Sequence, residues 1–208
     1  MSVQIKRYPK GPLQENTYLL TDEATGLKAI IDPGYIGDEI KSEIGDKDNL
    51  KYVMLTHGHY DHFYCAEEYL KDYPNAKFVA PKKDIYLMSK DWNKEFLAFG
   101  NSTPQCPKAD IYVVEGDEIN LGDSVFGFIE TPGHTEGGIC IQIGDIVFSG
   151  DTLFKLSVGN SSFETGNWDM LLDSIKNKLY VLDENTIVYP GHGLPTTILF
   201  EKKSNPFV

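Results

Sequence analysis

Residues 55–64 read LTHGHYDHFY and hold three of the chain's five histidines, plus an aspartate, within six positions. Imidazoles and a carboxylate at this density fit three interpretations: a solvated turn, a pH-sensitive patch, or half of a metal site. The apolar run YVMLT that leads into the cluster indicates a strand buried on both faces. His57 and His59 lie two positions apart at the end of that strand, so both rings can emerge on the same side.

The other two histidines occupy the same kind of position. His134 in ETPGHTEGG and His192 in YPGHGLP each follow a Pro-Gly pair at the end of an apolar, strand-like run. Loops at strand ends are where a scaffold presents reactive side chains, so five histidines on such loops favour one shared site. Asp151 directly follows the run DIVFSG and is a further candidate ligand, with a turn cap as the equal alternative.

The residue types also suggest more than one ion. Asp61 and His62 are adjacent, so they point the same way less easily and can serve a second ion. Neutral imidazole binds zinc, iron and similar metals, whereas carboxylates favour harder ions or bridge two ions. Asp32 in IIDPG is a candidate acceptor beside a ligand histidine, and a turn cap is again the equal alternative.

The composition limits the class of protein. The chain has 208 residues, 41% of them hydrophobic and 24% charged, as in an ordinary globular protein with ample core. The net charge of −12 argues against binding to nucleic acid and to anionic membranes. The three cysteines form no CxxC pair, and the N-terminus lacks an apolar signal core. Both features predict a cytoplasmic protein.

The secondary-structure signals predict an α/β fold. Strand character is expected over residues 2–8, 16–22, 27–34, 52–56, 76–81, 111–117, 123–133, 138–144, 145–151 and 185–193. Helices are expected over residues 37–44, 61–73, 82–99 and 167–182. The segment 100–110 is expected to be a loop, and Trp92, Phe96 and Phe99 are expected to pack on the core or wall a pocket.

The two halves of the chain have a similar style, with several strands and their own helices. We therefore expect two sheets packed face to face with helices outside, in four layers, although periodicity alone establishes only the α/β class. Neither a repeat nor a linker-like segment interrupts the sequence, so residues 1–208 are expected to form a single domain.

Four motifs in this order resemble the metallo-β-lactamase superfamily: THGHYDH, TPGHTEGG, FSGDTLF and YPGHG. The separations are also similar, with 72 residues from His62 to His134, 17 to Asp151 and 41 to His192. The resemblance runs from about Asn16 to Phe207. Within the superfamily, the segments ENTYLL, IIDPG, DTLFKLSVG and GHGLPTTILFEKKSNPF are most similar to the short glyoxalase II-like hydrolases.

This resemblance implies a four-layer αββα sandwich with a two-metal site at the edge of its sheets. One ion takes three histidines, the other takes an aspartate and two histidines, and a second aspartate bridges them. The matching positions are, in that order, His57, His59 and His134; Asp61, His62 and His192; and Asp151. The implied cofactors are two divalent ions, zinc in first place, with iron or manganese as alternatives.

The implied reaction is hydrolysis of a thioester such as S-lactoylglutathione by a hydroxide that bridges the two metals. Asp61 and Asp151 would be the catalytic residues beside the ions. A binuclear hydrolase of another ester or of a phosphodiester is the alternative, and a non-enzymatic metal-binding protein is a third interpretation. Structural zinc sites tend to be closed and rich in cysteine, whereas this ligand set contains none.

Two departures from the family pattern concern the substrate. Full-length glyoxalase II enzymes carry a helical C-terminal extension that contacts glutathione, and this sequence ends 16 residues after His192. Asn160 and Ser162 stand where short members usually have Arg and Asp, and asparagine lacks the charged, bidentate geometry of arginine. Asn160 and Lys155 are the candidate substrate contacts, with surface solvation as the alternative for Lys155. The expected partner is a small thioester or ester, with neither nucleic acid nor membrane.

Overall fold

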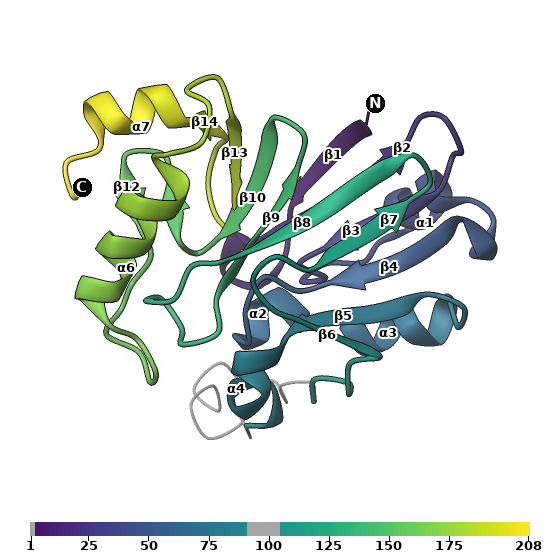
Figure 1. Ribbon diagram of the computed structural model, residues 1–208. Helices are drawn as coiled ribbons and strands as arrows, with labels where there is room; N and C mark the ends of the chain where they lie inside the picture. The colour runs from purple at the N-terminus through teal and green to yellow at the C-terminus, as the bar shows by residue number, and fades with distance from the viewer. Residues whose placement is uncertain (1–2, 91–104) are drawn as a thin grey trace.

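The computed structural model describes residues 3–90 and 105–208, which form two six-stranded sheets packed face to face (Figure 1). In spatial order, the first sheet consists of β1 (Val3–Pro9), β2 (Asn16–Asp22), β3 (Lys28–Ile31), β4 (Leu50–Met54), β5 (Lys77–Pro81) and β6 (Ile111–Val113). The second consists of β14 (Thr196–Thr197), β13 (Ile187–Pro190), β10 (Ile146–Gly150), β9 (Ile139–Ile143), β8 (Ser124–Glu130) and β7 (Glu118–Leu121). A small hairpin pairs β11 (Leu153–Phe154) with β12 (Ser157–Val158).

Helices cover the outer face of each sheet. The first sheet is covered by α1 (Asp38–Ile44), α2 (Tyr60–Phe63), α3 (Ala66–Asp72) and α4 (Ile85–Ser89). The second is covered by α6 (Trp168–Ser174), the π-helical segment η5 (Ile175–Leu179) and α7 (Ile198–Ser204). Three short 3-10 turns are η1 (Pro12–Gln14), η2 (Lys47–Asn49) and η3 (Lys82–Asp84). In the described part of the chain, none of these helices has the length and apolar content needed to cross a lipid bilayer.

Alternation along the strands divides the apolar side chains among three cores. In β2, Leu19 belongs to the core shared with α1 and α3, whereas its neighbours Tyr18 and Leu20 face the second sheet. In β9, Ile141 meets them in this central core, and Cys140 faces the outer core under α6. Three cores separate four layers, which confirms the predicted αββα sandwich and its α/β class.

Strand direction brings many strand ends to one edge of the sandwich. Strands β3 to β6 are mutually parallel. Strands β8, β10 and β13 share one direction, because β9 is antiparallel to both β8 and β10, and β13 is parallel to β10. The loops at the carboxyl ends of such strands are where open α/β sheets bind ligands.

Three local features differ from the sequence-based prediction. The helix expected over residues 61–73 divides into α2 and α3, because Cys65 leaves helical geometry (φ −107°, ψ 11°) and donates its N–H to the carbonyl of Pro33. The helix expected over residues 167–182 is α-helical only to Ser174 and continues as a π-helix to Leu179. Strands β7 and β14 and helix α7 were not expected.

The prediction for residues 82–110 can be compared only in part. Residues 82–89 form η3 and α4, which agrees with helical character at the start of this stretch. Trp92, Phe96 and Phe99 lie outside the described residues, and so does the first part of the loop expected over residues 100–110.

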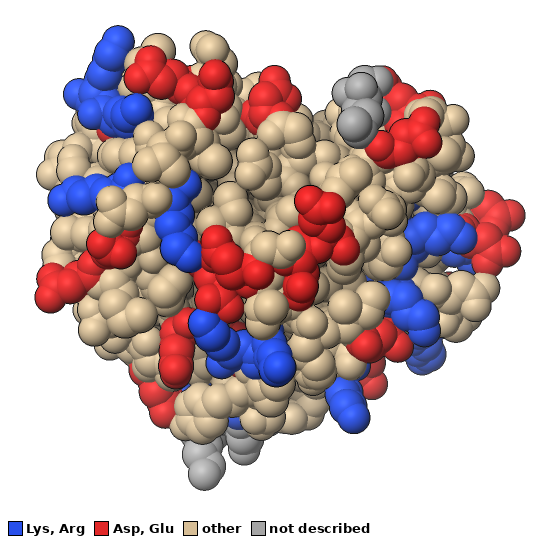
Figure 2. Space-filling model, in the orientation of Figure 1, with Lys and Arg blue, Asp and Glu red and all other residues tan. Residues whose placement is uncertain are grey.

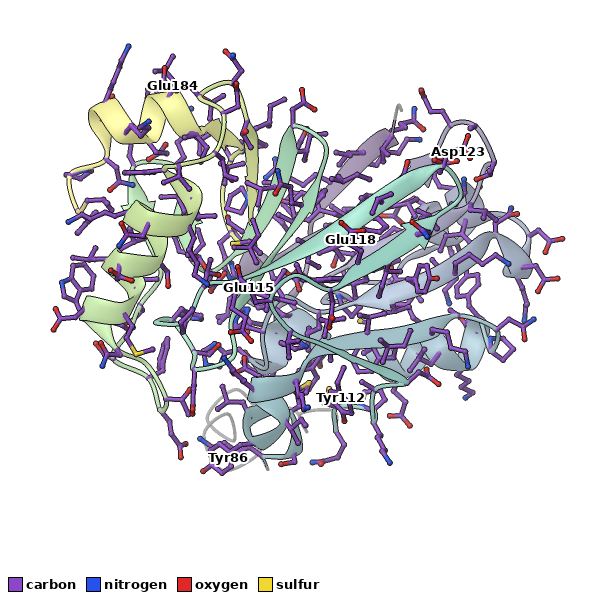
Figure 3. The ribbon with its side chains drawn as sticks, viewed as in Figure 1. Tyr86, Tyr112, Glu115, Glu118, Asp123 and Glu184 are labelled. Carbon is purple, nitrogen blue, oxygen red and sulfur yellow. The ribbon has the colours of Figure 1, made fainter. Side chains whose placement is uncertain are left out.

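Charged side chains of both signs are mixed over the surface, as Figure 2 shows for one face. Several of them pair across elements: Lys178 lies 2.7 Å from Glu115, which Figure 3 labels, and Lys41 lies 2.7 Å from Asp72. Such exposed pairs contribute about 0–1 kcal/mol each, so they do not decide the fold.

Candidate metal centre

The residues singled out from the sequence meet at the edge where the parallel strands end. After β4, a loop carries His57 and His59 into α2, which holds Asp61 and His62. In the second sheet, one candidate follows each of three strands: His134 after β8, Asp151 after β10 and His192 after β13. The expectation that every histidine lies on a loop is wrong for His62. This residue lies in α2, a single helical turn, and its side chain is buried.

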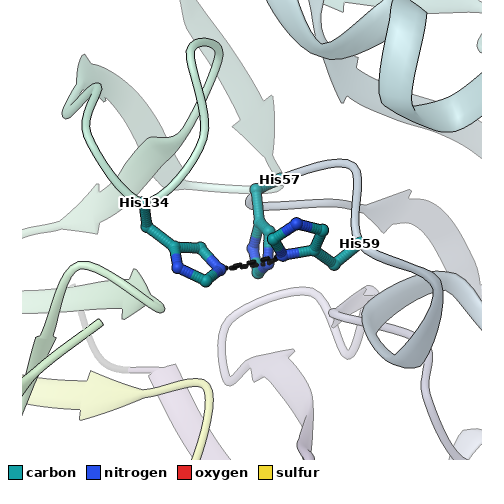
Figure 4. Close-up of side chains that lie close together, drawn as sticks. All are labelled: His57, His59 and His134. Atoms are coloured by element: carbon teal, nitrogen blue, oxygen red, sulfur yellow. Dashed lines mark hydrogen bonds between the residues drawn. The ribbon is translucent and has the colours of Figure 1, made fainter. Parts of the chain in front are cut away.

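Three histidines direct one ring nitrogen each at a common point (Figure 4). His59 Nδ1 lies 3.1 Å from His57 Nε2 and 2.9 Å from His134 Nε2, and the latter two nitrogens are 3.2 Å apart. A tetrahedral ion with bonds of about 2.0–2.1 Å needs ligand nitrogens about 3.3 Å apart. The triangle is therefore close to the size that one such ion requires.

The outward nitrogens of two of these rings determine which tautomer each ring adopts. His134 Nδ1 lies 2.8 Å from the carbonyl of Asn160, which can only accept, so this nitrogen carries the hydrogen. Thr56 gives its hydroxyl hydrogen to Asp32, so its oxygen accepts from His57 Nδ1 at 3.1 Å. The Nε2 atoms of His57 and His134 consequently face each other with lone pairs, an arrangement that a cation between them would stabilise.

Burial keeps His57 and His59 neutral. The exposed fractions of His57, His59 and His134 are 2%, 8% and 4%. Burial lowers the pKa of His57 well below its usual value, and the nearby His62 and His134 act in the same direction. Burial and the proximity of His134 lower the pKa of His59 to about 3. Neutral imidazole is the form that binds a metal ion.

A second group lies beside the first. His192 Nε2 lies 3.3 Å from Asp61 Oδ2, and His62 Nε2 lies 3.8 Å from the same oxygen. Asp151 lies between the two groups: its Oδ1 is 3.4 Å from His62 Nε2, and its Oδ2 is 3.5 Å from His134 Nε2. The seven candidates thus form two adjoining groups with one shared carboxylate.

Buried atoms without a hydrogen bond test whether the residues suit metal ions. In the two groups, His62 Nδ1, His62 Nε2 and Asp151 Oδ1 are fully enclosed and make no hydrogen bond to the described residues, and the last two lie 3.4 Å apart where the groups adjoin. Buried polar atoms are nearly always hydrogen-bonded, and a bound ion is one partner that would satisfy such exceptions. Three imidazoles in one group, and two imidazoles with a carboxylate in the other, are donor sets for zinc, iron or manganese. The residues present therefore fit two divalent ions.

Asp32 lies beneath the second group. Its Oδ2 is 3.0 Å from His62 Nδ1, and its carboxylate accepts the N–H and the hydroxyl of Thr56. Asp32 holds a left-handed backbone conformation (φ 52°) directly after β3, which an aspartate tolerates better than most residues. Asp32 thus lies beside a candidate ligand histidine, as predicted, at ion-pair distance and without a hydrogen bond to His62 Nδ1.

Comparison with known proteins agrees with this geometry. The family model described as the metallo-β-lactamase superfamily matches residues 11–192, which include all seven candidates. The chain belongs to the metallo-β-lactamase superfamily. Among its relatives, hydroxyacylglutathione hydrolase GloC of Haemophilus influenzae is 32% identical over 99% of this chain and 98% of that protein.

Solved structures of the superfamily are similar over nearly the whole chain. The crystal structure of the BLEG-1 B3 metallo-β-lactamase has a TM-score of 0.88 at 29% identity and covers 98% of this chain and 99% of that one. TTHA1623 in a di-iron-bound form has a TM-score of 0.84 at 30% identity and covers 98% of this chain and 100% of that one.

A cavity of about 360 Å³ lies beside the two groups of candidate ligands. Its described lining residues are Leu13, His59, Tyr60, Asp61, Lys90, His134, Asp151, Ser162, Phe163 and Glu164. The ring of Phe163 lies edge-on to His59, with centroids 5.5 Å apart. At the rim, Glu164 accepts from Lys90 at 2.6 Å and from the hydroxyl of Tyr86 at 2.5 Å, which ties the loop before α6 to α4.

The two candidate substrate contacts lie near this cavity rather than on its lining. Asn160 accepts the N–H of Ser162 through its side chain and the ring N–H of His134 through its carbonyl. Lys155 lies in the turn between β11 and β12, with its ammonium 5.7 Å from the ring centroid of Phe200. Neither residue is among those that line the cavity, so their contact with substrate stays a prediction.

Sequence reasoning overlooked Phe163, Lys90 and Asp84 as parts of the site. Asp84 follows the strand β5 closely, which is the same signal that singled out Asp32 and Asp151 after other strands. Phe163 and Lys90 lie in irregular segments whose sequence carries no comparable signal.

Proposed function

We propose that this chain is a metal-dependent hydrolase that cleaves a thioester such as S-lactoylglutathione, with two divalent ions held by the seven side chains described above. The shared carboxylate of Asp151 between two groups of ligands carries the proposal, since a single-ion or structural site needs no such arrangement. Zinc is the first candidate, with iron and manganese as alternatives, and the similarity to di-iron TTHA1623 supports iron. The 32% identity to GloC supports the thioester.

When bound, two such ions would lower the pKa of a water molecule towards neutrality and polarise the substrate carbonyl. The residues of the chain supply acceptors for the proton that this water releases. Burial raises the pKa of both Asp61 and Asp151, but the neighbouring histidines, above all His62, lower it on balance. Both side chains are therefore carboxylates at neutral pH and can accept a proton.

The substrate would lie in the cavity beside these carboxylates. A volume of about 360 Å³ is within the range of small-molecule sites. Leu13, Tyr60 and Phe163 give it an apolar wall, which limits the access of bulk water to the acyl carbon. A thiolate leaves readily because its parent thiol has a pKa of about 8.5, so no general acid is required.

We propose the segment from Ser162 to Glu164 as the wall that faces the leaving group, with Asn160 and Lys155 as outer contacts. Among the described residues, the rim cation Lys90 is paired with Glu164, so this pair adds no net positive charge where a glutathione site would favour it. Binding of glutathione conjugates is accordingly proposed to be weak. A small-molecule substrate, a cytoplasmic location and the absence of nucleic-acid or membrane partners remain part of this proposal, and the net charge of −12 supports the last of these.

A second candidate function is hydrolysis of a β-lactam, because the BLEG-1 B3 enzyme has a TM-score of 0.88 to this chain. Other esters and phosphodiesters are further alternatives with the same metal chemistry.

The proposal is tested by measuring metal content and hydrolysis on the same purified protein. The metal-free chain is loaded separately with zinc, iron(II) and manganese(II). Each form is then assayed with S-lactoylglutathione, a simple acyl thioester, a carboxylic ester, a phosphodiester and a chromogenic β-lactam. Two ions per chain with thioester turnover above all other substrates are expected. Two ions with turnover confined to another substrate would assign that alternative, and a loaded protein that hydrolyses none would overturn the proposed function.

A further inference from the structure

Asp84 is a buried carboxylate that its own helix does not use. It occupies the N-cap position of α4 with an exposed fraction of 1%. An aspartate at this position normally accepts an N–H of the first helical turn. The side chain of Asp84 makes no such capping bond. It extends instead to the two loops that carry the three-histidine group.

Asp84 accepts three buried hydrogen bonds from these loops. Its Oδ2 accepts the N–H of Gly58 at 2.8 Å, and Gly58 lies between His57 and His59. The same oxygen accepts the hydroxyl of Thr135 at 2.7 Å, and Oδ1 accepts the N–H of Gly137 at 2.7 Å. Thr135 directly follows His134. One carboxylate therefore joins the loop of two candidate ligands to the loop of the third.

Both loops approach Asp84 so closely that a side chain would not fit. A Cβ atom on Gly137 would lie 2.4 Å from the backbone nitrogen of Asp84. A Cβ atom on Gly58 would lie 2.8 Å from the Cβ of Leu87 and 3.1 Å from the carbonyl oxygen of Asp84. Real Cβ atoms essentially never make contacts below 3.0 Å, and each position would make one, so both positions depend on glycine. Gly58, Thr135 and Gly137 thus donate three hydrogen bonds to the carboxylate of Asp84, and the two glycines lie too close to α4 and its N-cap to carry a side chain.

We propose that Asp84 is the positioning residue of the three-histidine group, and that it sets the affinity and coordination geometry of the ion bound there. The inference rests on the metal centre proposed above. Fixing Gly58 against Thr135 fixes the distance between the backbone of His57 and His59 and the backbone of His134. Without this constraint, the three nitrogens would have to be brought together by the ion itself, which weakens binding.

His192 of the second group is held by residues other than Asp84, so loss of Asp84 should affect one ion more than the other. Asn16 donates to the carbonyls of Pro190 and Gly193 at 2.9 and 3.0 Å, on either side of His192. Arg7 also donates to the carbonyl of Gly193, at 2.6 Å. None of these contacts includes Asp84.

The test compares three variants with the unaltered chain. Asp84→Asn keeps the shape but replaces one acceptor oxygen with a donor. Thr135→Val removes a single donor and leaves the carboxylate intact. Asp145→Asn, in the exposed turn between β9 and β10, is the control for loss of one negative charge. Each protein is loaded with cobalt(II), its visible absorption spectrum is recorded, and its metal content is measured during dialysis against increasing chelator.

Asp84→Asn is expected to hold one ion as the unaltered chain does and to bind the other about 10–100-fold more weakly. Its cobalt spectrum should change in intensity, because the coordination of one ion is altered. Thr135→Val should change the metal affinity and the cobalt spectrum in the same direction as Asp84→Asn, but to a smaller extent. Asp145→Asn should match the unaltered chain in both. Thermal unfolding of the metal-free proteins shows which variants are folded.

Equal weakening of both ions, or unchanged affinity and spectrum in a folded Asp84→Asn protein, would overturn the inference. If Asp84→Asn does not fold, Thr135→Val decides by the same criterion. An unaltered chain that binds no divalent ion would overturn this inference together with the proposed function. An unaltered chain that binds two ions and hydrolyses no substrate would contradict only the proposed function, and the affinities would still decide the role of Asp84.

Discussion

Asp32 and His62 form a buried pair beneath the candidate metal centre, with Oδ2 of the carboxylate 3.0 Å from Nδ1 of the imidazole. Burial favours the neutral form of His62, but Asp32, Asp151 and Asp61 outweigh it and raise the pKa well above its usual value of 6.5. His62 is thus protonated at neutral pH before metal binds, whereas His57 and His59 are already neutral. The two groups of candidate ligands thus differ in the protonation of their buried histidines.

The first prediction concerns protons released on metal binding. A ligand imidazole must lose its extra proton, so loading both ions at pH 7 should release at least one proton per chain, from His62 and, in part, from His192, whose pKa is also raised. Above the raised pKa of His62, this release should fall, because the imidazole is neutral before metal is added. Titration calorimetry in two buffers of different ionisation enthalpy measures the number of protons. Asp32→Asn should reduce the release, because it lowers the pKa of His62. Equal heats in both buffers at pH 7 would show that His62 is not charged.

The second prediction concerns Asp61. Asp61→Ala removes both a ligand of the second group and an acceptor for the proton of water, so turnover should fall by about 100-fold or more. The fold should persist, because Asp61 belongs to the site and not to the apolar cores. Steady-state kinetics with circular dichroism checks both statements. Asp169→Ala, an exposed change in the first turn of α6, is the control, and an Asp61→Ala protein as fast as this control removes Asp61 from the site.

The third prediction concerns the apolar wall of the cavity. Phe163 is 54% exposed and lies against His59, so Phe163→Ala should raise KM for the thioester by roughly three- to tenfold with metal content unchanged. Phe207, which is 48% exposed and does not line the cavity, provides Phe207→Ala as the matched control. Equal KM values for the two variants would exclude contact between Phe163 and the substrate.

The fourth prediction concerns the central core. Phe148 is 1% exposed and its ring packs between those of Tyr18 and Tyr189, at centroid distances of 5.1 and 5.4 Å. Phe148→Ala should lower the free energy of unfolding by about 3–5 kcal/mol. Phe207→Ala should cost about 1 kcal/mol or less. Denaturant unfolding of the metal-free proteins measures both, and similar values for the two would contradict the assignment of Phe148 to the core.

The layers of the fold could be predicted because strand periodicity is a local property. The alternation of Tyr18, Leu19 and Leu20 already assigns one side chain to one face and two to the other. The break before α3 could not be predicted in this way. It depends on a hydrogen bond from Cys65 to Pro33, which are 32 positions apart and meet only in the folded chain.

In the candidate site, too, some residues could be predicted from local sequence signals, whereas others depend on contacts that form only in the folded chain. His57, His59 and Asp151 could be singled out because each closely follows an apolar strand. The partners of Asp84 lie 26, 51 and 53 positions away, so its role depends on the tertiary fold. The wall residue Phe163 lies in an irregular loop, where neither periodicity nor strand ends indicate a function.

The most direct test of the two-ion centre is an anomalous-scattering map from crystals of the metal-loaded chain, collected at the absorption edge of the bound metal. Our account predicts two peaks about 3.5–4 Å apart. One should lie among His57, His59 and His134, the other among Asp61, His62 and His192, and Asp151 should contact both. A single peak, or peaks away from these side chains, would contradict it.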